Sequence, residues 1–221
     1  MTNADAIFAA CREELAETEA KLRRHPYVAA LEEGRIARPR LRLFAGEQFH
    51  IISGDLRGMG HLVSRFWGRV SGPLFLGGVQ AEQAALEALL PLAAALEMTQ
   101  EDLEAHEPLA GAHAYGAYMA WLAHYGEDAQ VAAAFAVNFP AWGENCGRIG
   151  AALRSRYGMT TAQVRFFELF AAPAPGLADT AATIIEAALA RGVSARLVKR
   201  AVRLLQDYEL MFWETLWEAS R

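Results

Sequence analysis

The sequence predicts an all-α fold, a single-domain bundle of seven to nine helices, some of them kinked, over residues 1–221. Three observations predict it. No alternating run of β-branched residues is bounded by turn residues in the way a strand would be. Apolar residues recur instead at the three- and four-residue spacing of a helix. Hydrophobic residues make up 53% of the chain, above the usual share, which indicates a large core, an internal pocket or an oligomer interface.

The first helices are marked by capping residues and by glycine and proline. Asn3 or Asp5 can cap a first helix that runs to about Arg24, because short polar side chains bond the free N–H groups of a first turn. Gly34 then ends the short helix in HPYVAALEEG. Pro39 opens a long, mostly apolar segment that we also expect to be helical.

The middle of the chain continues with helices separated by a glycine-rich stretch and a polar turn. The long segment is expected to bend near Gly54, and GPLFLGG (residues 72–78) reads as a connector. Residues 79–98 form the next helix, which Pro91 is expected to kink. TQED, residues 99–102, is typical of a helix cap followed by a short turn.

The last part of the chain is expected to hold further helices with short connections. One helix ends at Gly126, and the next is expected to bend near Pro140. TTAQVRFFELF reads as a short helix with a threonine cap, and APAPG (residues 172–176) as a linker. Residues 177–191 are expected to be helical, and Ser194 caps the final helix.

Composition disfavours several classes of protein. The net charge is −5 and no block of Lys and Arg stands out beyond residues 35–42, so nucleic acid is not expected as a partner. The two cysteines are too few for a disulfide scaffold, and no Cys/His cluster indicates zinc. Acidic residues come too early for a signal peptide, and no apolar run is long enough to span a bilayer. We therefore expect a cytoplasmic protein with no membrane segment and no cofactor.

One carboxylate lies within the apolar stripe of the final helix. Val202, Leu205, Glu209, Phe212 and Leu216 share one face at helical spacing, whereas the other charged residues of this helix fall on the opposite side. Burying a lone carboxylate costs several kcal/mol, so such a group is usually paired, protonated or functional. A purely structural bond to a neighbouring tyrosine or arginine is the alternative, and this helix alone does not decide between them.

Other residues suited to chemistry have more ordinary interpretations. Glu47 and His50 form an E-x-x-H motif, but a carboxylate-bridged di-iron site needs a second copy and further acidic ligands, and the sequence has no second copy. His25, a conceivable haem ligand, is typical of a helix cap or a core partner. Cys11 and Cys146 lie among apolar residues and are interpreted as buried small side chains. No metal site is therefore predicted.

Aromatic and polar residues at helical spacing also suit a pocket for a small, flat heteroaromatic molecule. Asn138 is the second polar residue, after Glu209, that lies in an apolar helical run. The simpler interpretation of the aromatic residues is a hydrophobic core. The candidate ligand-binding residues from these helices are Tyr115, Tyr118, Asn138, Trp142 and Phe212.

Three stretches carry a family resemblance over essentially the whole chain. HPYV (residues 25–28) runs on into a long helix, HAYGAYMAWLAHYG forms a central helix rich in aromatic residues, and YEL (residues 208–210) precedes Phe212 and Trp213. Together they resemble the first motif, the tyrosine-containing central helix and the Y-E-L-x-F-W pattern of the TenA family. The resemblance implies the haem-oxygenase-like helical fold of these thiaminase-2-like proteins.

The resemblance also implies a pocket between helices that binds an aminopyrimidine, with Glu209 as the catalytic acid/base. In the family, a cysteine attacks the pyrimidine ring and an aspartate on the long helix holds the amino group of the ring. In this sequence the cysteine position falls on Asn138 and the aspartate position on Gln48, which joins the candidate ligand-binding residues. An amide is no nucleophile, so the resemblance implies that Glu209 is retained and the covalent chemistry is not.

These observations favour a divergent TenA-like protein that binds or hydrolyses a small thiamin-related aminopyrimidine or another heteroaromatic molecule. As an enzyme, it would be a thiaminase-2-like hydrolase without a cysteine nucleophile. Two alternatives stay open: a non-catalytic ligand-binding module, and a haem-oxygenase-like metal oxidase with Glu47 and His50 as ligands. The resemblance and the apolar content also predict a homodimer or homotetramer.

Overall fold

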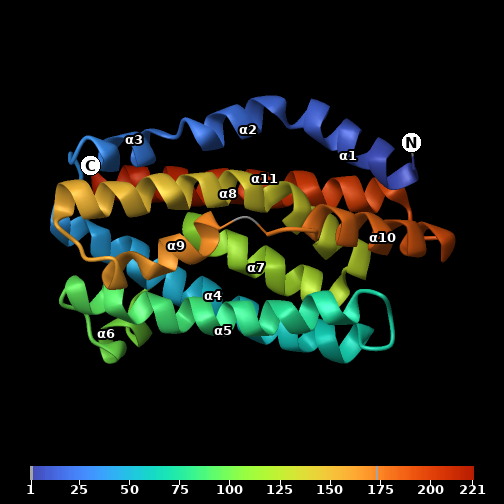
Figure 1. Cartoon of the computed structure of the whole chain (residues 1–221), viewed down its shortest axis with the longest axis horizontal. Coiled ribbons are helices and arrows are strands. Elements are labelled where there is room, and N and C mark those ends of the chain that lie inside the picture. The colour runs from blue at the N-terminus through green and yellow to red at the C-terminus, as the bar shows by residue number, and fades with distance from the viewer. Residues whose placement is uncertain (1, 173) are drawn as a thin grey trace.

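The computed structural model describes residues 2–172 and 174–221, and every regular element within them is a helix (Figure 1). This confirms the all-α prediction. The α-helices are α1 (Asn3–Glu14), α2 (Ala16–Arg23), α3 (Pro26–Glu32), α4 (Leu41–Phe66), α5 (Gly72–Ala95), α6 (Gln100–Glu104), α7 (Ala110–Tyr125), α8 (Asp128–Tyr157), α9 (Arg165–Ala171), α10 (Leu177–Ala190) and α11 (Ala195–Ser220). Two 3₁₀-helices, η1 (Arg38–Arg40) and η2 (Ala162–Val164), precede α4 and α9.

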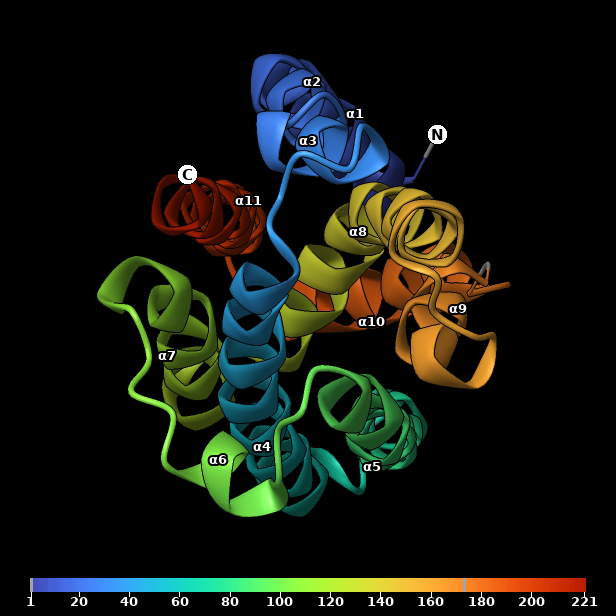
Figure 2. The same ribbon diagram turned by 90° about the vertical axis from the view of Figure 1, so that its left-hand side faces the viewer.

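The five long helices form the body of the bundle. Helix α4 packs against α5 and α7, and α11 packs against α7 and α8. The short helices α1–α3 run along one side of the molecule over α8 and α11, while α5 lies on the opposite side (Figures 1 and 2). Helices α9 and α10 pack on α8. This arrangement leaves the inward faces of α4, α5, α7, α8 and α11 directed toward one another. Among the described residues, no helix combines the length and the apolarity that crossing a membrane requires.

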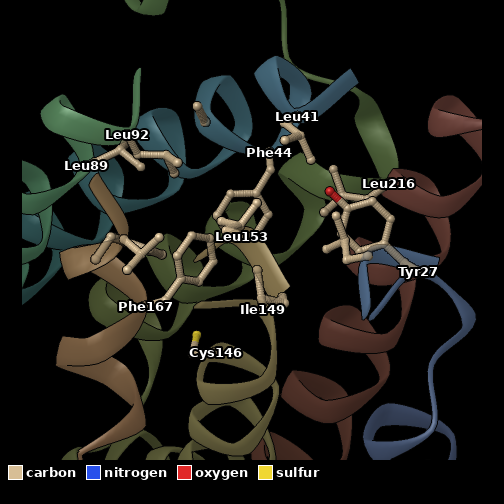
Figure 3. Packing of buried hydrophobic residues seen from close by; sticks show 14 of the residues in the cluster. Tyr27, Leu41, Phe44, Leu89, Leu92, Cys146, Ile149, Leu153, Phe167 and Leu216 are labelled. Carbon is tan, nitrogen blue, oxygen red and sulfur yellow. The ribbon is translucent and has the colours of Figure 1, made fainter. Parts of the chain in front are cut away.

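The largest hydrophobic cluster joins α4 to α8, α9 and α11 through aromatic rings. The ring of Phe44 lies 5.1 Å from that of Phe167 and 6.4 Å from that of Trp213, measured between centroids. Figure 3 shows Phe44 and Phe167 together with Ile149 and Leu153 of α8. Because these side chains come from four helices, their burial fixes the positions of α8 and α11 relative to α4.

Several predicted helix ends are confirmed, and two predictions for the first helix are wrong. The short helix ends before Gly34, α7 ends before Gly126, and the Ser194 hydroxyl accepts a hydrogen bond from the backbone of Arg196 at the start of α11. The predicted first helix is instead broken at Leu15 into α1 and α2. The cap of α1 is Thr2, whose hydroxyl accepts from the backbone N–H of Asp5, rather than Asn3 or Asp5 itself.

The predicted connector at residues 72–78 is also wrong, because this stretch forms the first turns of α5. Of its glycines, Gly78 lies closest to a neighbouring helix. A Cβ atom on Gly78 would lie 2.8 Å from the sulfur of Met59 on α4, so glycine lets the two helices approach each other. Helices α5 and α8 run through Pro91 and Pro140, and α4 runs through Gly54. The linker predicted at residues 172–176 joins α9 to α10, and its residue 173 lies outside the described residues.

Candidate functional site

A narrow cavity lies inside the bundle, between the inward faces of α4, α5, α7, α8, α9 and α11. Its volume is about 40 Å³, room for one or two water molecules. The side chains that line it are Gln48, Ile51, Ile52, Asp55, Glu82, Tyr115, Phe135, Asn138, Phe139, Trp142, Phe170, Glu209 and Phe212. The lining is therefore mostly apolar and aromatic with a few polar groups, which is the usual composition of a small-molecule site.

The structure brings six of the seven sequence-predicted site residues to this cavity. Those that line it are Gln48, Tyr115, Asn138, Trp142, Glu209 and Phe212. Tyr118 does not. It lies one turn beyond Tyr115, and its buried ring lies 5.1 Å from the ring of Tyr208 and 6.0 Å from that of Trp121, measured between centroids. Tyr118 therefore packs between α7 and α11, outside the cavity lining.

Glu209 projects from α11 and is buried, with 2% of its surface exposed. Its Oε1 accepts a hydrogen bond from the indole N–H of Trp213 at 3.1 Å, and its Oε2 accepts one from the side-chain amide of Asn138. Burial raises the pKa of Glu209 to about 7, and the hydrogen bonds from Trp213 and Asn138, which favour the ionised form, pull in the opposite direction. The carboxyl group can therefore accept or release a proton near neutral pH.

Asn138 connects Glu209 to a chain of buried polar groups. Its amide nitrogen also donates to Oε1 of Gln206 at 2.7 Å, and the amide of Gln206 donates to Glu19 on α2. Gln206 was not among the residues predicted from the sequence. Its position three residues before Glu209 places it on the same face of α11 and could have indicated it. These bonds hold Asn138 and, through it, the carboxyl of Glu209 in one orientation.

Two further carboxyl groups, Asp55 on α4 and Glu82 on α5, line the cavity, and sequence analysis missed both. Burial raises the pKa of Glu82 to about 7. Burial, together with the nearby negative charge of Glu82, raises the pKa of Asp55 well above its usual range. Asp55 follows Gln48 by seven residues, and that spacing on one helical face was a signal in the sequence. Nothing in the sequence around Glu82 distinguishes it from a surface residue.

The two cysteines lie outside the cavity lining, and both are buried and free. Cys146 belongs to the central hydrophobic cluster (Figure 3), where burial raises the pKa of its thiol. Cys11, on α1, lies in a separate cluster that includes side chains of α10, and burial raises the pKa of its thiol to about 11. Neither thiol is poised as a thiolate nucleophile, which agrees with the interpretation of both as buried small side chains.

The E-x-x-H motif serves to anchor the chain between α6 and α7. Oε1 of Glu47 accepts from the backbone N–H of Leu109 at 2.8 Å and lies 3.2 Å from Nε2 of His106. The ring of His50 bonds the backbone carbonyl of His106 at 2.8 Å. Neither Glu47 nor His50 lines the cavity. In the described part of the chain, no group of three or more His, Cys, Asp or Glu side chains is placed to hold a metal ion.

His25 acts as a helix cap rather than facing the cavity. Its Nδ1 accepts from the backbone N–H of Tyr27 at 3.3 Å, at the start of α3. Burial lowers the pKa of His25 to about 4, so the ring is neutral and able to accept this hydrogen bond.

Three aromatic side chains separate the cavity from the surface. Phe139, Trp142 and Phe170 line both the cavity and a neighbouring groove of about 570 Å³ between α5, α8, α9 and α10. The rings of Trp142 and Phe170 meet edge to face, with centroids 5.7 Å apart. These three side chains therefore form the wall between the cavity and the groove. We name Phe139, Trp142 and Phe170 the aromatic partition.

Comparison with known families matches most of the chain to one of them. The model of the TENA/THI-4/PQQC family matches residues 12–219. Among curated proteins, none matches the sequence at a significant level.

Solved structures show the same fold at low sequence identity. A TenA homologue from Pseudomonas syringae pv. tomato DC3000 superposes with a TM-score of 0.81 at 15% identity, over 95% of this chain and 92% of the other. A TenA homologue from P. horikoshii OT3 gives 0.73 at 19% identity, over 96% and 99%. A domain of unknown function with a haem-oxygenase-like fold from Shewanella denitrificans OS217 gives 0.71 at 15% identity, over 95% and 91%. The chain therefore has the haem-oxygenase-like fold.

Proposed function

The chain belongs to the TENA/THI-4/PQQC family, and on that basis we propose that it binds and hydrolyses a small thiamin-related aminopyrimidine inside the bundle. The observation that carries the proposal is the setting of Glu209. This carboxyl group is buried at the wall of an aromatic cavity, has a pKa raised to about 7, and is oriented by the side chains of Trp213 and Asn138.

The walls of the cavity suit a flat ring. Six aromatic side chains contribute to it, namely Tyr115, Phe135, Phe139, Trp142, Phe170 and Phe212. Aromatic walls stack on a heteroaromatic ring, and a few polar groups then fix its orientation. Gln48, 4% exposed on α4, supplies a neutral amide that can hydrogen-bond ring nitrogens.

Water is the nucleophile in this proposal, because no cysteine is among the lining residues described above. Ionised Glu209 takes a proton from a water molecule as its oxygen bonds to the carbon that carries the leaving nitrogen. The carbon–nitrogen bond breaks, its electron pair stays on nitrogen, and Glu209 returns the proton to that nitrogen. An aminomethylpyrimidine and water would thus give a hydroxymethylpyrimidine and ammonia, with no oxidant or reductant required.

Substitution of the carboxyl group tests this role. General acid–base catalysis contributes about 10²–10⁴-fold, so Glu209→Gln should lower kcat by about 100-fold or more. KM should change little, because the amide of Gln has the size of the carboxyl group. The assay measures hydroxymethylpyrimidine released from thiamin and from an aminomethylpyrimidine by liquid chromatography and mass spectrometry.

Glu214→Gln is the matched control, since Glu214 is exposed on the same helix, and it should leave turnover unchanged. A Glu209→Gln protein as active as the parent would refute the acid/base role. A parent protein that releases no product from either compound would refute hydrolysis altogether.

A non-catalytic binding module is the second candidate, and the amide of Asn138 beside Glu209 favours it. An amide in direct contact with the proposed acid/base cannot form a covalent intermediate with the ring. This reading predicts saturable binding of the aminopyrimidine, seen as a rise in melting temperature, with no product after prolonged incubation.

A further inference from the structure

The carboxyl group of Asp55 lacks a hydrogen-bond partner although it is buried in the cavity wall. Asp55 is 7% exposed, and its Oδ1 accepts no hydrogen bond from any residue that the structure describes. A buried acceptor without a partner costs free energy, and such atoms in a cavity wall are commonly satisfied by a bound molecule. In contrast, both carboxyl oxygens of Glu209 already accept hydrogen bonds from the protein. The unsatisfied acceptor therefore lies at the Asp55 end of the cavity.

Glu82 brings a second acidic group to the same end. It projects from α5, which packs against α4, and it lines the cavity with Asp55. The negative charge of Glu82 contributes to the raised pKa of Asp55. The charges of Asp55 and Glu82 both contribute to the raised pKa of Tyr115. Two carboxyl groups so placed cannot both ionise at low cost unless a positive charge is added between them.

Among the described residues, no positive side chain lines the cavity to supply that charge. Its lining contains three carboxyl groups, on Asp55, Glu82 and Glu209, and no Lys, Arg or His. An anionic ligand is therefore disfavoured, and a cationic one would relieve the repulsion between the carboxylates. A flat cation also fits the aromatic walls, since aromatic faces attract positive charge.

We propose that Asp55 and Glu82 form a subsite for a planar nitrogen cation of the amidinium type, in which two neighbouring N–H groups face the carboxylates. An amino group beside a protonated ring nitrogen, as in an aminopyrimidinium, has this form and can bond a carboxylate through two parallel hydrogen bonds. The proposal rests on the cavity of the proposed function and deepens it by defining how the ligand is oriented. The cationic edge of the ring faces α4 and α5, and the leaving group faces Glu209 on α11.

The test compares a flat cation with its neutral isostere. Benzamidine carries an amidinium group on an aromatic ring, and benzamide has the same shape without the charge. Isothermal titration of the full chain at pH 7 should show benzamidine binding at least tenfold more tightly than benzamide. Asp55→Asn and Glu82→Gln should each reduce this preference at least fivefold. The matched control is Glu87→Gln, on the exposed side of α5, which should retain the preference of the parent.

Equal binding of the two compounds by the parent, or a preference that survives in both variants, would overturn the proposal. Far-UV circular dichroism checks that each variant is folded. Glu82 is partly exposed, so Glu82→Gln decides the outcome if Asp55→Asn does not fold.

Pyrimidine hydrolysis is assayed on the same protein preparation, so that the two proposals fail separately. Hydrolysis without a preference for benzamidine refutes the cation subsite alone. A preference that depends on Asp55 or Glu82, without hydrolysis, refutes the catalytic proposal alone and leaves the subsite standing.

Discussion

At Glu209, two opposing effects set the proton affinity of one carboxyl group. Burial disfavours its charge, while donors from Trp213 and Asn138 favour it. The balance holds the pKa at about 7. A group with such a pKa can both accept and donate a proton near neutral pH. Because Trp213 lies one turn beyond Glu209 on α11, the helix itself supplies one of the donors.

Removing the indole donor should raise the pKa of Glu209. In Trp213→Phe the ionised carboxylate loses one hydrogen bond, so the protonated form is favoured up to a higher pH. The acid limb of the pH profile of kcat should move to higher pH, and turnover at pH 6 should fall about threefold relative to the parent. Initial rates between pH 5 and pH 9 measure the shift.

Trp217→Phe serves as the control for this substitution, because Trp217 lies on the same helix, stacks against Arg221 and does not line the cavity. A profile that moves to lower pH in Trp213→Phe, or that moves equally in both variants, would contradict the assigned role of the indole.

The residues of the cavity differ in how far the sequence predicts them. Glu209 and Asn138 each interrupt an apolar run, so their inward direction follows from helical spacing alone. Asp55 shares a helical face with Gln48 but lies between Gly54 and Leu56 and close to Arg57, which masks the pattern. Glu82 lies in a polar stretch, and only the packing of α5 against α4 turns it toward the cavity.

Helices α8 and α9 supply the aromatic partition between the cavity and the groove. Phe139 and Trp142 come from α8 and Phe170 from α9, and all three are partly exposed. A side chain that borders both a cavity and a surface groove has room to rotate toward the groove. We therefore predict that a ligand enters by rotation of these side chains rather than by separation of whole helices.

Truncation of one ring in the partition should speed ligand entry. Phe170→Ala should raise the association rate constant for an aminopyrimidine about threefold or more, because rotation of this ring no longer limits entry. The loss in stability should be below the about 3–5 kcal/mol of a fully buried phenylalanine. Stopped-flow tryptophan fluorescence measures the rate.

Leu169→Ala is the matched control, since Leu169 lines the groove but not the cavity. An association rate unchanged in Phe170→Ala, or raised as much in Leu169→Ala, would place the entry route elsewhere.

Element boundaries that the sequence did not predict have causes in packing. The glycines of residues 72–78 resemble a connector, but Gly78 lies where α5 packs closely on Met59 of α4. The break at Leu15 lies in a stretch with uninterrupted helical spacing, and the 2% exposed side chain of Leu15 packs in a cluster with α1 and α10. Both features depend on neighbouring helices and are invisible in local sequence.

Across the whole molecule, the buried carboxyl groups of the cavity make stability depend on pH. The pKa of Glu209 is about 7 in the folded chain, against an ordinary value of 4.5. Its contribution to stability is therefore fully present below about pH 4.5 and is lost as the pH rises through about 7. Glu82 and Asp55, with pKa values raised in the same direction, act with the same sign.

Glu209→Gln removes the titrating carboxyl group, so comparison with the parent isolates the contribution of Glu209 to the pH dependence of stability. The difference in unfolding free energy between variant and parent should shift in favour of the variant by up to about 3 kcal/mol from pH 5 to pH 8. Urea denaturation at the two pH values measures it, with Glu214→Gln as the exposed control. A difference that does not change with pH would contradict a raised pKa at Glu209.

The assembly of the chain stays a prediction. Apolar content above the usual share and exposed rings such as Trp121 and Tyr125 on α7, which are 43% and 75% exposed, agree with self-association. Light scattering should give the mass of a homodimer or homotetramer, and a mass of 24.2 kDa would show a monomer.

Isotope incorporation tests the central claim most directly. The parent protein and Glu209→Gln are incubated with an aminomethylpyrimidine in water enriched in ¹⁸O, and the pyrimidine product is analysed by mass spectrometry. Hydrolysis with Glu209 as the proton carrier predicts a hydroxymethylpyrimidine carrying one ¹⁸O atom from the parent, and at least 100-fold less of it from the variant. Absence of labelled product from the parent, or equal amounts from both proteins, would contradict the account.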